Sequence, residues 1–343
     1  RGTALRVALA RGADPVLAVG RAGPAARGGR WPFHEIPVVD LTPLLDGSDP
    51  KKVSKEIGYI CENIGFLYIK NHGVPKSLIQ EAYKLTAELF ALPYEEKEKL
   101  SIVNYGELFR GYIPMYTENA DPKNTKDFKE CFDLGKHYDQ VSPFFGPNPI
   151  PEKIERFREV FEQYHDEMMR LSRKLIGAIA LSLDLPEDYF EKLQRKPITI
   201  HRLNYYPPQT GPISVGEIGT GAHTDYGFLT ILSQDSNGGL QVQNREGEWV
   251  SAPPVEDTFV VNIGDLVQTF TNDRYPATLH RVINTSGKAR YSIPFFIDLD
   301  YDAVVEVVPT CISPSNPAKY QPYTCGKYKY EKFLSTYTHL QKT

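Results

Sequence analysis

The spacing of apolar positions changes near residue 197 and divides the chain into two parts. Before this point, apolar residues recur in alternating steps of three and four, the spacing of one face of an α-helix. After it, short runs rich in β-branched and aromatic residues follow a period of two, separated by Gly, Pro, Asn and Asp. The sequence therefore predicts a long helix with a core-facing stripe, followed by a β-rich region. The stripe consists of Ile154, Phe157, Phe161, Tyr164, Met168, Leu171 and Leu175.

The β-rich region is expected to form eight short strands without intervening helices. A parallel sheet needs crossover helices between its strands, and that alternation is absent here. We therefore predict a mainly β fold with flanking helices, whose core is a jelly roll at residues 197–300. Long core-packing helices are assigned to 151–196, and a strand and a docked helix to 301–343. The expected strands are 198–206, 222–233, 239–243, 248–251, 258–263, 278–284, 290–299 and 304–308.

The N-terminal half mixes strand and helix signals. An apolar run at 36–41, a helical stretch near 50–63 and a second apolar run at 65–69 indicate a strand, a helix and a strand. Pro75 then opens a helix rich in Glu, Lys, Ala and Leu that we extend to about Leu100, because proline is favourable in a first helical turn. The remainder of this half, to residue 150, shows little periodicity and is predicted to be irregular surface or a lid.

The first thirty residues differ in composition from the rest. They contain six Arg, eight Ala and six Gly, no Lys, and a single acid, Asp14. Such a segment has little apolar surface to bury, so we expect residues 1–30 to be a flexible leader, an artificial scar or the remnant of an organelle transit peptide. The body of the fold is expected to begin at Trp31.

Overall composition excludes several classes of function. Lys and Arg number 39 against 43 Asp and Glu, so no basic surplus is present to bind nucleic acid. The apolar stretches are too short to span a bilayer. The four cysteines lack a Cys-x-x-Cys pair, which argues against a zinc ribbon, a thioredoxin motif or a disulfide framework. We expect a soluble, monomeric, cytoplasmic protein, or an organellar one if the leader is a transit remnant. The cysteines are Cys61, Cys131, Cys311 and Cys325.

Two histidines and one aspartate form a candidate metal site. His223 and Asp225 are two residues apart in a predicted strand, so their side chains are expected on one face. A His-x-Asp pair occurs often by chance, but His280 lies in another predicted strand and supplies a third ligand. Two imidazoles and one carboxylate leave open positions on a metal, as in non-haem Fe(II) oxygenases. Zinc usually takes four ligands.

Two further pairs accompany the metal candidates. Arg290 and Ser292 share a face of a predicted strand, and a guanidinium fork with a hydroxyl suits a carboxylate. Asn204 and Tyr206 share a face at the end of the first strand of the β-rich region. Seen alone, Arg290 and Ser292 are more typical of a surface pair on a strand, and Asn204 and Tyr206 of a strand-end turn. Their common order with the metal candidates along the chain favours a site.

With these motifs, the chain resembles the 2-oxoglutarate and Fe(II)-dependent dioxygenases of the isopenicillin N synthase-like branch. The likeness runs over nearly the whole chain after the leader. In the first half it rests on Ile36-Pro37-Val38-Val39-Asp40-Leu41, Gly65-Phe66-Leu67-Tyr68-Ile69 and Asn71-His72-Gly73-Val74. In the second half it rests on Asn204-Tyr205-Tyr206-Pro207, His223-Thr224-Asp225, Val261-Asn262-Ile263-Gly264-Asp265, Leu279-His280-Arg281-Val282 and Arg290-Tyr291-Ser292.

The resemblance implies a double-stranded β-helix preceded by a cap region at 31–150. It implies Fe(II) on His223, Asp225 and His280, with 2-oxoglutarate and O₂ as cosubstrates and ascorbate as a reductant. The far carboxylate of 2-oxoglutarate would meet Arg290 and Ser292, with Tyr206 and Asn204 nearby. The implied reaction releases succinate and CO₂ while a C–H bond of a small, carboxylate-bearing metabolite is hydroxylated, desaturated or closed into a ring, as in biosynthesis and secondary metabolism.

Two alternatives remain at this stage. One is an iron oxidase of the same fold that works without 2-oxoglutarate and uses the Arg-x-Ser pair for another carboxylate. The other is a non-catalytic binding module with a vestigial triad. We do not prefer the remaining histidines as ligands: His72 is assigned to a turn, His165 to the polar side of the long helix and His201 to the face opposite Arg202. The expected substrate-lining residues are Arg110, Tyr112, Phe132, Phe270 and Phe296.

Overall fold

The computed structural model describes residues 33–139, 143–210 and 216–337; the predicted leader lies outside the described residues. The helices are α1 (Thr42–Leu45), α2 (Pro50–Asn63), α3 (Lys76–Ala91), α4 (Tyr94–Glu98), η1 (Ile102–Leu108), α5 (Phe157–Ser182), η2 (Glu191–Leu193), α6 (Asp265–Phe270), η3 (Pro309–Cys311) and α7 (Cys325–Thr336). The strands are β1 (Val38–Asp40), β2 (Phe66–Lys70), β3 (Gly111–Ile113), β4 (Lys126–Asp127), β5 (Glu130–Leu134), β6 (Pro197–Tyr206), β7 (Glu217–Ile218), β8 (Thr220–His223), β9 (Leu229–Gln234), β10 (Leu240–Gln243), β11 (Trp249–Ser251), β12 (Thr258–Ile263), β13 (His280–Val282), β14 (Arg290–Asp300), β15 (Val304–Val305) and β16 (Tyr323–Thr324).

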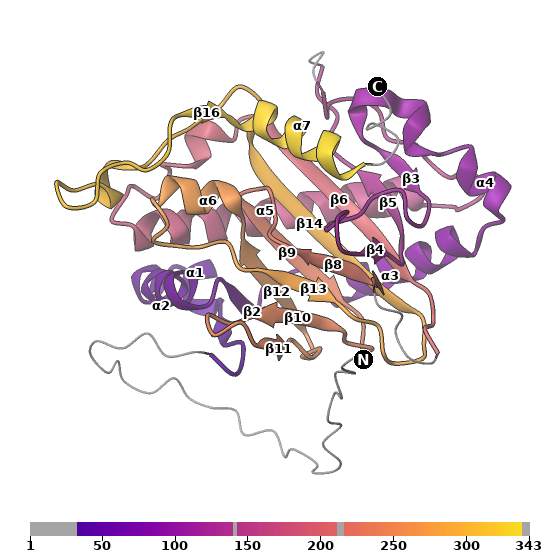
Figure 1. Cartoon of the computed structure of the whole chain (residues 1–343), viewed down its shortest axis with the longest axis horizontal. Coiled ribbons are helices and arrows are strands. Elements are labelled where there is room, and N and C mark those ends of the chain that lie inside the picture. The colour runs from indigo at the N-terminus through magenta and orange to yellow at the C-terminus, as the bar shows by residue number, and fades with distance from the viewer. Residues whose placement is uncertain (1–32, 140–142, 211–215, 338–343) are drawn as a thin grey trace, which may run out of the picture. The chain divides into compact units, whose positions relative to one another are not determined.

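Most of the strands form one large and one smaller sheet (Figure 1), while β4 pairs with β7 and β15 with β16 in two-stranded sheets. The large sheet has the order β1-β2-β12-β9-β14-β6-β5-β3 and is antiparallel except for the β1–β2 pair. The smaller sheet has the order β11-β10-β13-β8 and is antiparallel throughout. Apolar side chains from both sheets pack in one cluster, so the two sheets face each other as in a jelly roll. This cluster contains Ile36, Phe66, Tyr68, Tyr206, Leu240, Val242, Ala252, Val260 and Val282.

Helices cover the other face of the large sheet. The predicted stripe is largely correct, because Phe157, Tyr164 and the apolar positions that follow them along α5 are buried, although Ile154 precedes the helix. His201 of β6 stacks on Tyr164 of α5. Since neighbouring residues of a strand point to opposite faces, Arg202 next to it points toward the smaller sheet. The face that carries Arg202 is therefore the one on which a site can form.

The N-terminal half differs from the sequence prediction in two places. The helix that starts after Pro75 does not reach Leu100; α3 ends at Ala91, and Pro93 separates it from α4, because proline restricts the residue before it to extended backbone. The segment predicted as irregular contains β3 and β5, which extend the large sheet next to β6. Its strands are short, which is why their period of two was too brief to recognise.

The β-rich half also needs corrections. The run predicted as one strand at 222–233 is two strands, β8 and β9, which belong to different sheets and are joined by a turn. Helix α6 interrupts the strands that were predicted to have no helix between them, and 304–308 contains only the short β15. His165 is buried against Phe295 and not on a polar helix face, because α5 packs on the sheet through more than one stripe.

The described helices include none with both the length and the apolar character needed to cross a membrane.

Candidate active site

The two candidate histidines face each other across the smaller sheet. His223 is the last residue of β8 and His280 the first of β13, and the two residues are directly paired in the register of these strands. Their ring centroids lie 4.2 Å apart. Sequence spacing alone cannot give this pairing, because β8 and β13 are brought together by the antiparallel register of the sheet.

Asp225 reaches the histidines by a different route from the predicted one. The prediction that it shares a strand with His223 is wrong, since β8 ends at His223 and Asp225 lies in the turn that leads to β9. The first residue of α6 fixes this turn: the backbone N–H of Asp265 donates to the carbonyl oxygen of Asp225 at 2.8 Å. The turn places Asp225 Oδ1 3.6 Å from His223 Nε2 and 3.5 Å from His280 Nε2.

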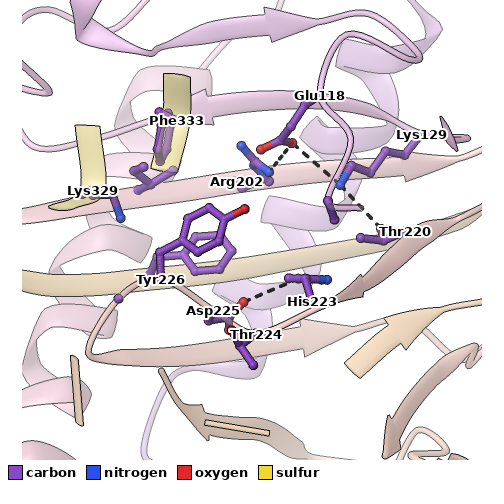
Figure 2. Close-up of a pocket in the computed structure, with 14 residues that line it drawn as sticks. Glu118, Lys129, Arg202, Thr220, His223, Thr224, Asp225, Tyr226, Lys329 and Phe333 are labelled. Carbon is purple, nitrogen blue, oxygen red and sulfur yellow. Dashed lines mark hydrogen bonds and ion pairs between the residues drawn. The ribbon is translucent and has the colours of Figure 1, made fainter. Parts of the chain in front are cut away.

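These three side chains can hold a metal ion. One ligand atom from each of them lies within 4.8 Å of the other two. Figure 2 shows His223 and Asp225 side by side on the wall of a cavity. Among the described residues this is the one such group of three or more His, Cys, Asp and Glu side chains. A face of two imidazole nitrogens and one carboxylate oxygen is a donor set that suits Fe(II).

Backbone carbonyl groups orient both imidazole rings. Nδ1 of His223 lies 2.8 Å from the carbonyl oxygen of Gly221, and Nδ1 of His280 lies 3.1 Å from that of Thr278. A carbonyl oxygen can only accept, so each Nδ1 carries a hydrogen and donates it. In the neutral rings, this leaves the Nε2 lone pairs directed toward Asp225 and free to bind a metal.

The Asp225 carboxylate is held by two residues that the sequence did not reveal in this role. Thr230 Oγ1 donates to Asp225 Oδ2 at 2.5 Å, and Asn262 Nδ2 donates to the same oxygen at 2.7 Å. Oδ1 therefore remains turned toward the histidines. Burial alone would raise the pKa of Asp225, but His280 and His223 outweigh it and hold the pKa well below its usual range. The group is thus a carboxylate, as metal binding requires.

The four residues predicted to surround a carboxylate lie together on β14 and β6. Arg290 is paired with Tyr206 and Ser292 with Asn204 in the register of the two strands. Ser292 Oγ accepts hydrogen bonds from Arg290 Nη1 and from Asn204 Nδ2, each at 3.3 Å. Arg290 also lies over the ring of Tyr206, 4.8 Å from its centroid.

Arg290 is a buried cation without a carboxylate partner. Only 1% of its surface is exposed, and it makes no ion pair with any described residue. Its Nε donates to the backbone carbonyl of Gly238, which uses one of five donors. A buried guanidinium whose charge is not neutralised is costly, and an anionic ligand removes that cost.

A cavity adjoins His223 and Asp225, and its empty space, counted together with the part open to solvent, is about 550 Å³. Phe296, one of the five predicted substrate contacts, lines it. The structure does not bring the other four there. Arg110 donates to the backbone carbonyls of Gly146, Phe144 and Lys136. The other three, buried away from the cavity, are Tyr112, Phe132 and Phe270.

Several residues of this cavity were absent from the sequence prediction. They come from the loops before and after β4, from β6, from the turn between β8 and β9 and from α7, which meet only in the folded chain. Arg202 was the only one of them that the sequence pattern could have indicated, because it lies on the same face of β6 as Asn204 and Tyr206. These additional lining residues include Glu118, Lys129, Arg202, Tyr226, Lys329 and Phe333.

Two family profiles match the chain. One describes the 2OG-Fe(II) oxygenase superfamily and matches residues 197–299. The other describes the N-terminal region of a non-haem dioxygenase in morphine synthesis and matches residues 36–153. The range 197–299 contains the three candidate metal ligands and the four residues predicted to surround a carboxylate.

The chain is similar to proteins named as 2-oxoglutarate-Fe(II) type oxidoreductases and as hydroxylases. The 2-oxoglutarate-Fe(II) type oxidoreductase ppzC of Metarhizium majus is 36% identical over 319 residues, which cover 85% of this chain and 84% of the relative. Homoarginine-6-hydroxylase 2-ODD-233 of Oryza sativa is 36% identical over 325 residues, which cover 89% of this chain and 98% of the relative.

The chain is also similar in fold to solved structures that contain bound 2-oxoglutarate. A full-length Neurospora crassa protein in complex with alpha-KG and thymine superimposes with a TM-score of 0.80 at 29% identity, covering 88% of this chain and 97% of that one. JOX2 in complex with 2OG, Fe and JA superimposes with a TM-score of 0.74 at 27% identity, covering 96% and 97%. The facing sheets and these neighbours confirm the predicted double-stranded β-helix.

Proposed function

The chain belongs to the 2OG-Fe(II) oxygenase superfamily, and we propose that His223, Asp225 and His280 hold the iron of this 2-oxoglutarate-dependent dioxygenase. The observation that supports this most is the convergence of their three ligand atoms within 4.8 Å. When bound, Fe(II) couples the oxidative decarboxylation of 2-oxoglutarate, to succinate and CO₂, with O₂-dependent oxidation of a substrate C–H bond.

The surrounding side chains prepare the ligands. The carbonyl groups of Gly221 and Thr278 keep each histidine in the tautomer that exposes Nε2. Thr230 and Asn262 occupy Oδ2 of Asp225 and so leave one oxygen for the metal. Ligands that are already aligned lose little conformational freedom on binding, which raises metal affinity.

We assign the far carboxylate of 2-oxoglutarate to Arg290 and Ser292. The support for this assignment is the buried, unpaired charge of Arg290 and the orientation of the Ser292 hydroxyl by Asn204. Asn204 and Tyr206 would act as neighbours of the cosubstrate. The complexes of similar chains with 2-oxoglutarate favour this role over that of a 2-oxoglutarate-independent oxidase or a binding module.

The prime substrate is a small organic molecule in this proposal, and the reaction is a hydroxylation. Relatives named homoarginine-6-hydroxylases, which are 32–37% identical, favour hydroxylation over desaturation or ring closure. The solved neighbours bind thymine and JA, which differ in shape and charge, so similarity alone does not select the substrate.

A monomer in a reducing compartment such as the cytoplasm fits this function. All four cysteines are free and buried, so the fold depends on no disulfide. Fe(II) and free thiols are both stable under reducing conditions.

Release of succinate tests the proposal. Purified protein with Fe(II), 2-oxoglutarate, ascorbate and O₂ should form succinate in step with oxidation of a small molecule from a metabolite panel that includes homoarginine and thymine. The His280→Ala variant should form none. Succinate from this variant at the wild-type rate, or product without 2-oxoglutarate, would contradict the assignment.

A further inference from the structure

The cavity beside the metal ligands contains a group of charged side chains that the iron and cosubstrate sites do not use. Figure 2 shows Glu118, Lys129 and Arg202 together on the side of the cavity opposite His223 and Asp225. Lys329 of α7 is the fourth charged lining residue apart from the metal ligands. A substrate in this cavity therefore meets the iron ligands on one side and fixed charges on the other.

Each cation of this cavity already has a carboxylate partner. Arg202 donates through Nε and Nη2 to the two oxygens of Asp133, both at 2.7 Å. Lys129 Nζ lies 3.1 Å from Asp127 Oδ2. Lys329 and Asp298 form the third pair, and both residues are buried.

Glu118 uses only one of its two carboxylate oxygens in contacts with the described residues. Its Oε2 accepts a hydrogen bond from Arg202 Nη1 at 2.6 Å and lies 3.7 Å from Lys129 Nζ. Among the described residues, the hydrogen bond from Arg202 to Oε2 is the one donated to this carboxylate, which leaves Oε1 without a donor. Burial alone would raise the pKa of Glu118, but Arg202 and Lys129 outweigh it and lower the pKa. The side chain is therefore ionised while only 11% of it is exposed.

The position of Glu118 is fixed by the fold. Its backbone forms a β-bridge with Tyr337, just beyond α7. The next residue, Asn119, donates its backbone N–H to the carbonyl oxygen of Thr336 at 3.2 Å. The backbone of Glu118 is thus anchored beside the cavity, and the hydrogen bond from Arg202 orients its carboxylate.

The charges of this group of side chains do not balance when the metal ligands are left out. Among the described residues, three cations are paired with four carboxylates, which leaves an excess of one negative charge; the carboxylates are Glu118, Asp127, Asp133 and Asp298. A partly desolvated anion with an unused oxygen is stabilised by a cation that donates hydrogen bonds. A carboxylate on the substrate would instead find every lining cation already paired.

The remaining walls suit a short apolar stem that carries such a cation. Phe296, Phe333, Tyr226 and Ile200 line the space around the charged group. Aromatic rings bind methylene groups by apolar contact and attract ammonium or guanidinium groups through their electron-rich faces. The cavity therefore combines apolar and aromatic walls with the Glu118 anion.

We propose that Glu118 binds a cationic nitrogen group of the prime substrate, an ammonium or a guanidinium, through its free Oε1. The substrate class is then a small aliphatic amine or guanidine that presents a C–H bond of its stem to the metal side of the cavity. This proposal rests on the proposed function, because it places the substrate in the cavity that His223 and Asp225 border. It adds a cationic group to the carboxylate that the sequence analysis expected on the substrate.

Matched pairs of compounds test the proposal. Anaerobic protein with Fe(II) and 2-oxoglutarate is titrated with n-butylguanidine or n-butylurea, and with n-pentylamine or 1-pentanol, while the visible absorption of the complex is followed. Within each pair the alkyl stem is the same, and only the first member carries a positive charge. We expect the cationic member to bind about 10–100-fold more tightly, the range of one or two charge-assisted hydrogen bonds.

A variant connects this preference to Glu118. Glu118→Gln keeps the size and an acceptor for Arg202 but removes the charge, so it should abolish the preference and leave binding of the neutral member unchanged. Glu107→Gln is the control, because Glu107 is an acid outside the cavity that accepts a hydrogen bond from Tyr330. The wild-type comparison stands by itself if Glu118→Gln does not fold.

The outcomes separate the two proposals. Absence of any visible band with Fe(II) and 2-oxoglutarate contradicts the proposed function. Three results overturn the assignment of Glu118 alone, provided that the band is normal. The band does not respond to any cationic compound, it responds equally to the neutral compounds, or the Glu118→Gln variant still prefers the cationic compounds.

Discussion

Asn262 and Thr230 lie directly opposite each other on β12 and β9, and both donate hydrogen bonds to Oδ2 of Asp225. This cross-strand pair of the large sheet thus orients Asp225, which lies in the turn between β8 of the smaller sheet and β9 of the large sheet. This links the rigidity of the larger sheet to the position of a candidate metal ligand, because neither donor can move without disturbing the strand register.

We predict that Asn262→Ala and Thr230→Val each weaken Fe(II) binding about tenfold or more, the usual effect of removing a hydrogen bond to a metal ligand. Thr258→Val is the matched control, since Thr258 lies on the same strand and its hydroxyl bonds to the carbonyl of Val255 at the surface. Fe(II) titration under anaerobic conditions measures the effect. Unchanged affinity in both variants would exclude the proposed role of this pair.

The three candidate ligands should be individually essential. His223→Ala, Asp225→Ala and His280→Ala are expected to abolish iron binding and succinate formation while the chain stays folded. Asp225→Glu should also be poor, because its longer side chain displaces the oxygen beyond metal-ligand distances. His137→Ala is the control, since the His137 side chain is 55% exposed and lies outside the site. A variant with normal iron content and activity would remove its residue from the ligand set.

Arg290 should determine the affinity for 2-oxoglutarate. Arg290→Lys keeps the charge but loses the planar fork, so affinity should fall about 10–100-fold, or about 1.5–3 kcal/mol. Binding of the prime substrate should change less. Arg274→Lys, which alters a surface arginine paired with Glu62, should have no effect. The opposite pattern, weaker substrate binding with unchanged 2-oxoglutarate affinity, would transfer Arg290 to the substrate site.

His201 should make the stability of the protein depend on pH. Burial, together with the nearby His165, lowers the pKa of His201 to about 3, and neither ring nitrogen has a hydrogen-bond partner among the described residues. An unfolded imidazole titrates near 6.5, so between about pH 6.5 and 3 the unfolded chain binds the extra proton. The free energy of unfolding therefore falls as the pH decreases through this interval, by up to about 1.4 kcal/mol per pH unit for this one group.

His201→Phe removes this titration and retains the packing against Tyr164. The variant should show a shallower loss of stability between pH 6 and pH 4, measured by urea unfolding. Part of the dependence should remain, because burial also lowers the pKa of His165 to about 4. The exposed His137→Phe variant should keep the full dependence. Equal slopes for wild-type and His201→Phe protein would refute the explanation.

The sequence predicted those features that depend on local patterns. Strand β12 agrees with its predicted limits, because each end is marked by a change in polarity. Arg290, Ser292, Asn204 and Tyr206 were grouped correctly since each pair follows the period of two, and β14 and β6 are neighbours in the sheet. The antiparallel register then places the two pairs opposite each other.

Features that depend on distant contacts could not be read from the sequence. Asp225 lies in a turn whose shape depends on a hydrogen bond from Asp265, forty residues later in the numbering. Glu118 belongs to a segment without periodicity and reaches the cavity because the end of α7 holds it there. Arg110 and Phe270 were expected at the substrate because of their types, yet their partners show that they stabilise the fold.

Anomalous scattering at the iron edge, from a crystal grown anaerobically with Fe(II) and 2-oxoglutarate, tests the central assignment most directly. We predict one strong peak per chain, within bonding distance of Nε2 of His223, Nε2 of His280 and Oδ1 of Asp225. The far carboxylate of 2-oxoglutarate should contact Arg290 and Ser292 in the same crystal. An iron peak elsewhere, or a 2-oxoglutarate molecule whose carboxylate avoids Arg290, would contradict the assignment.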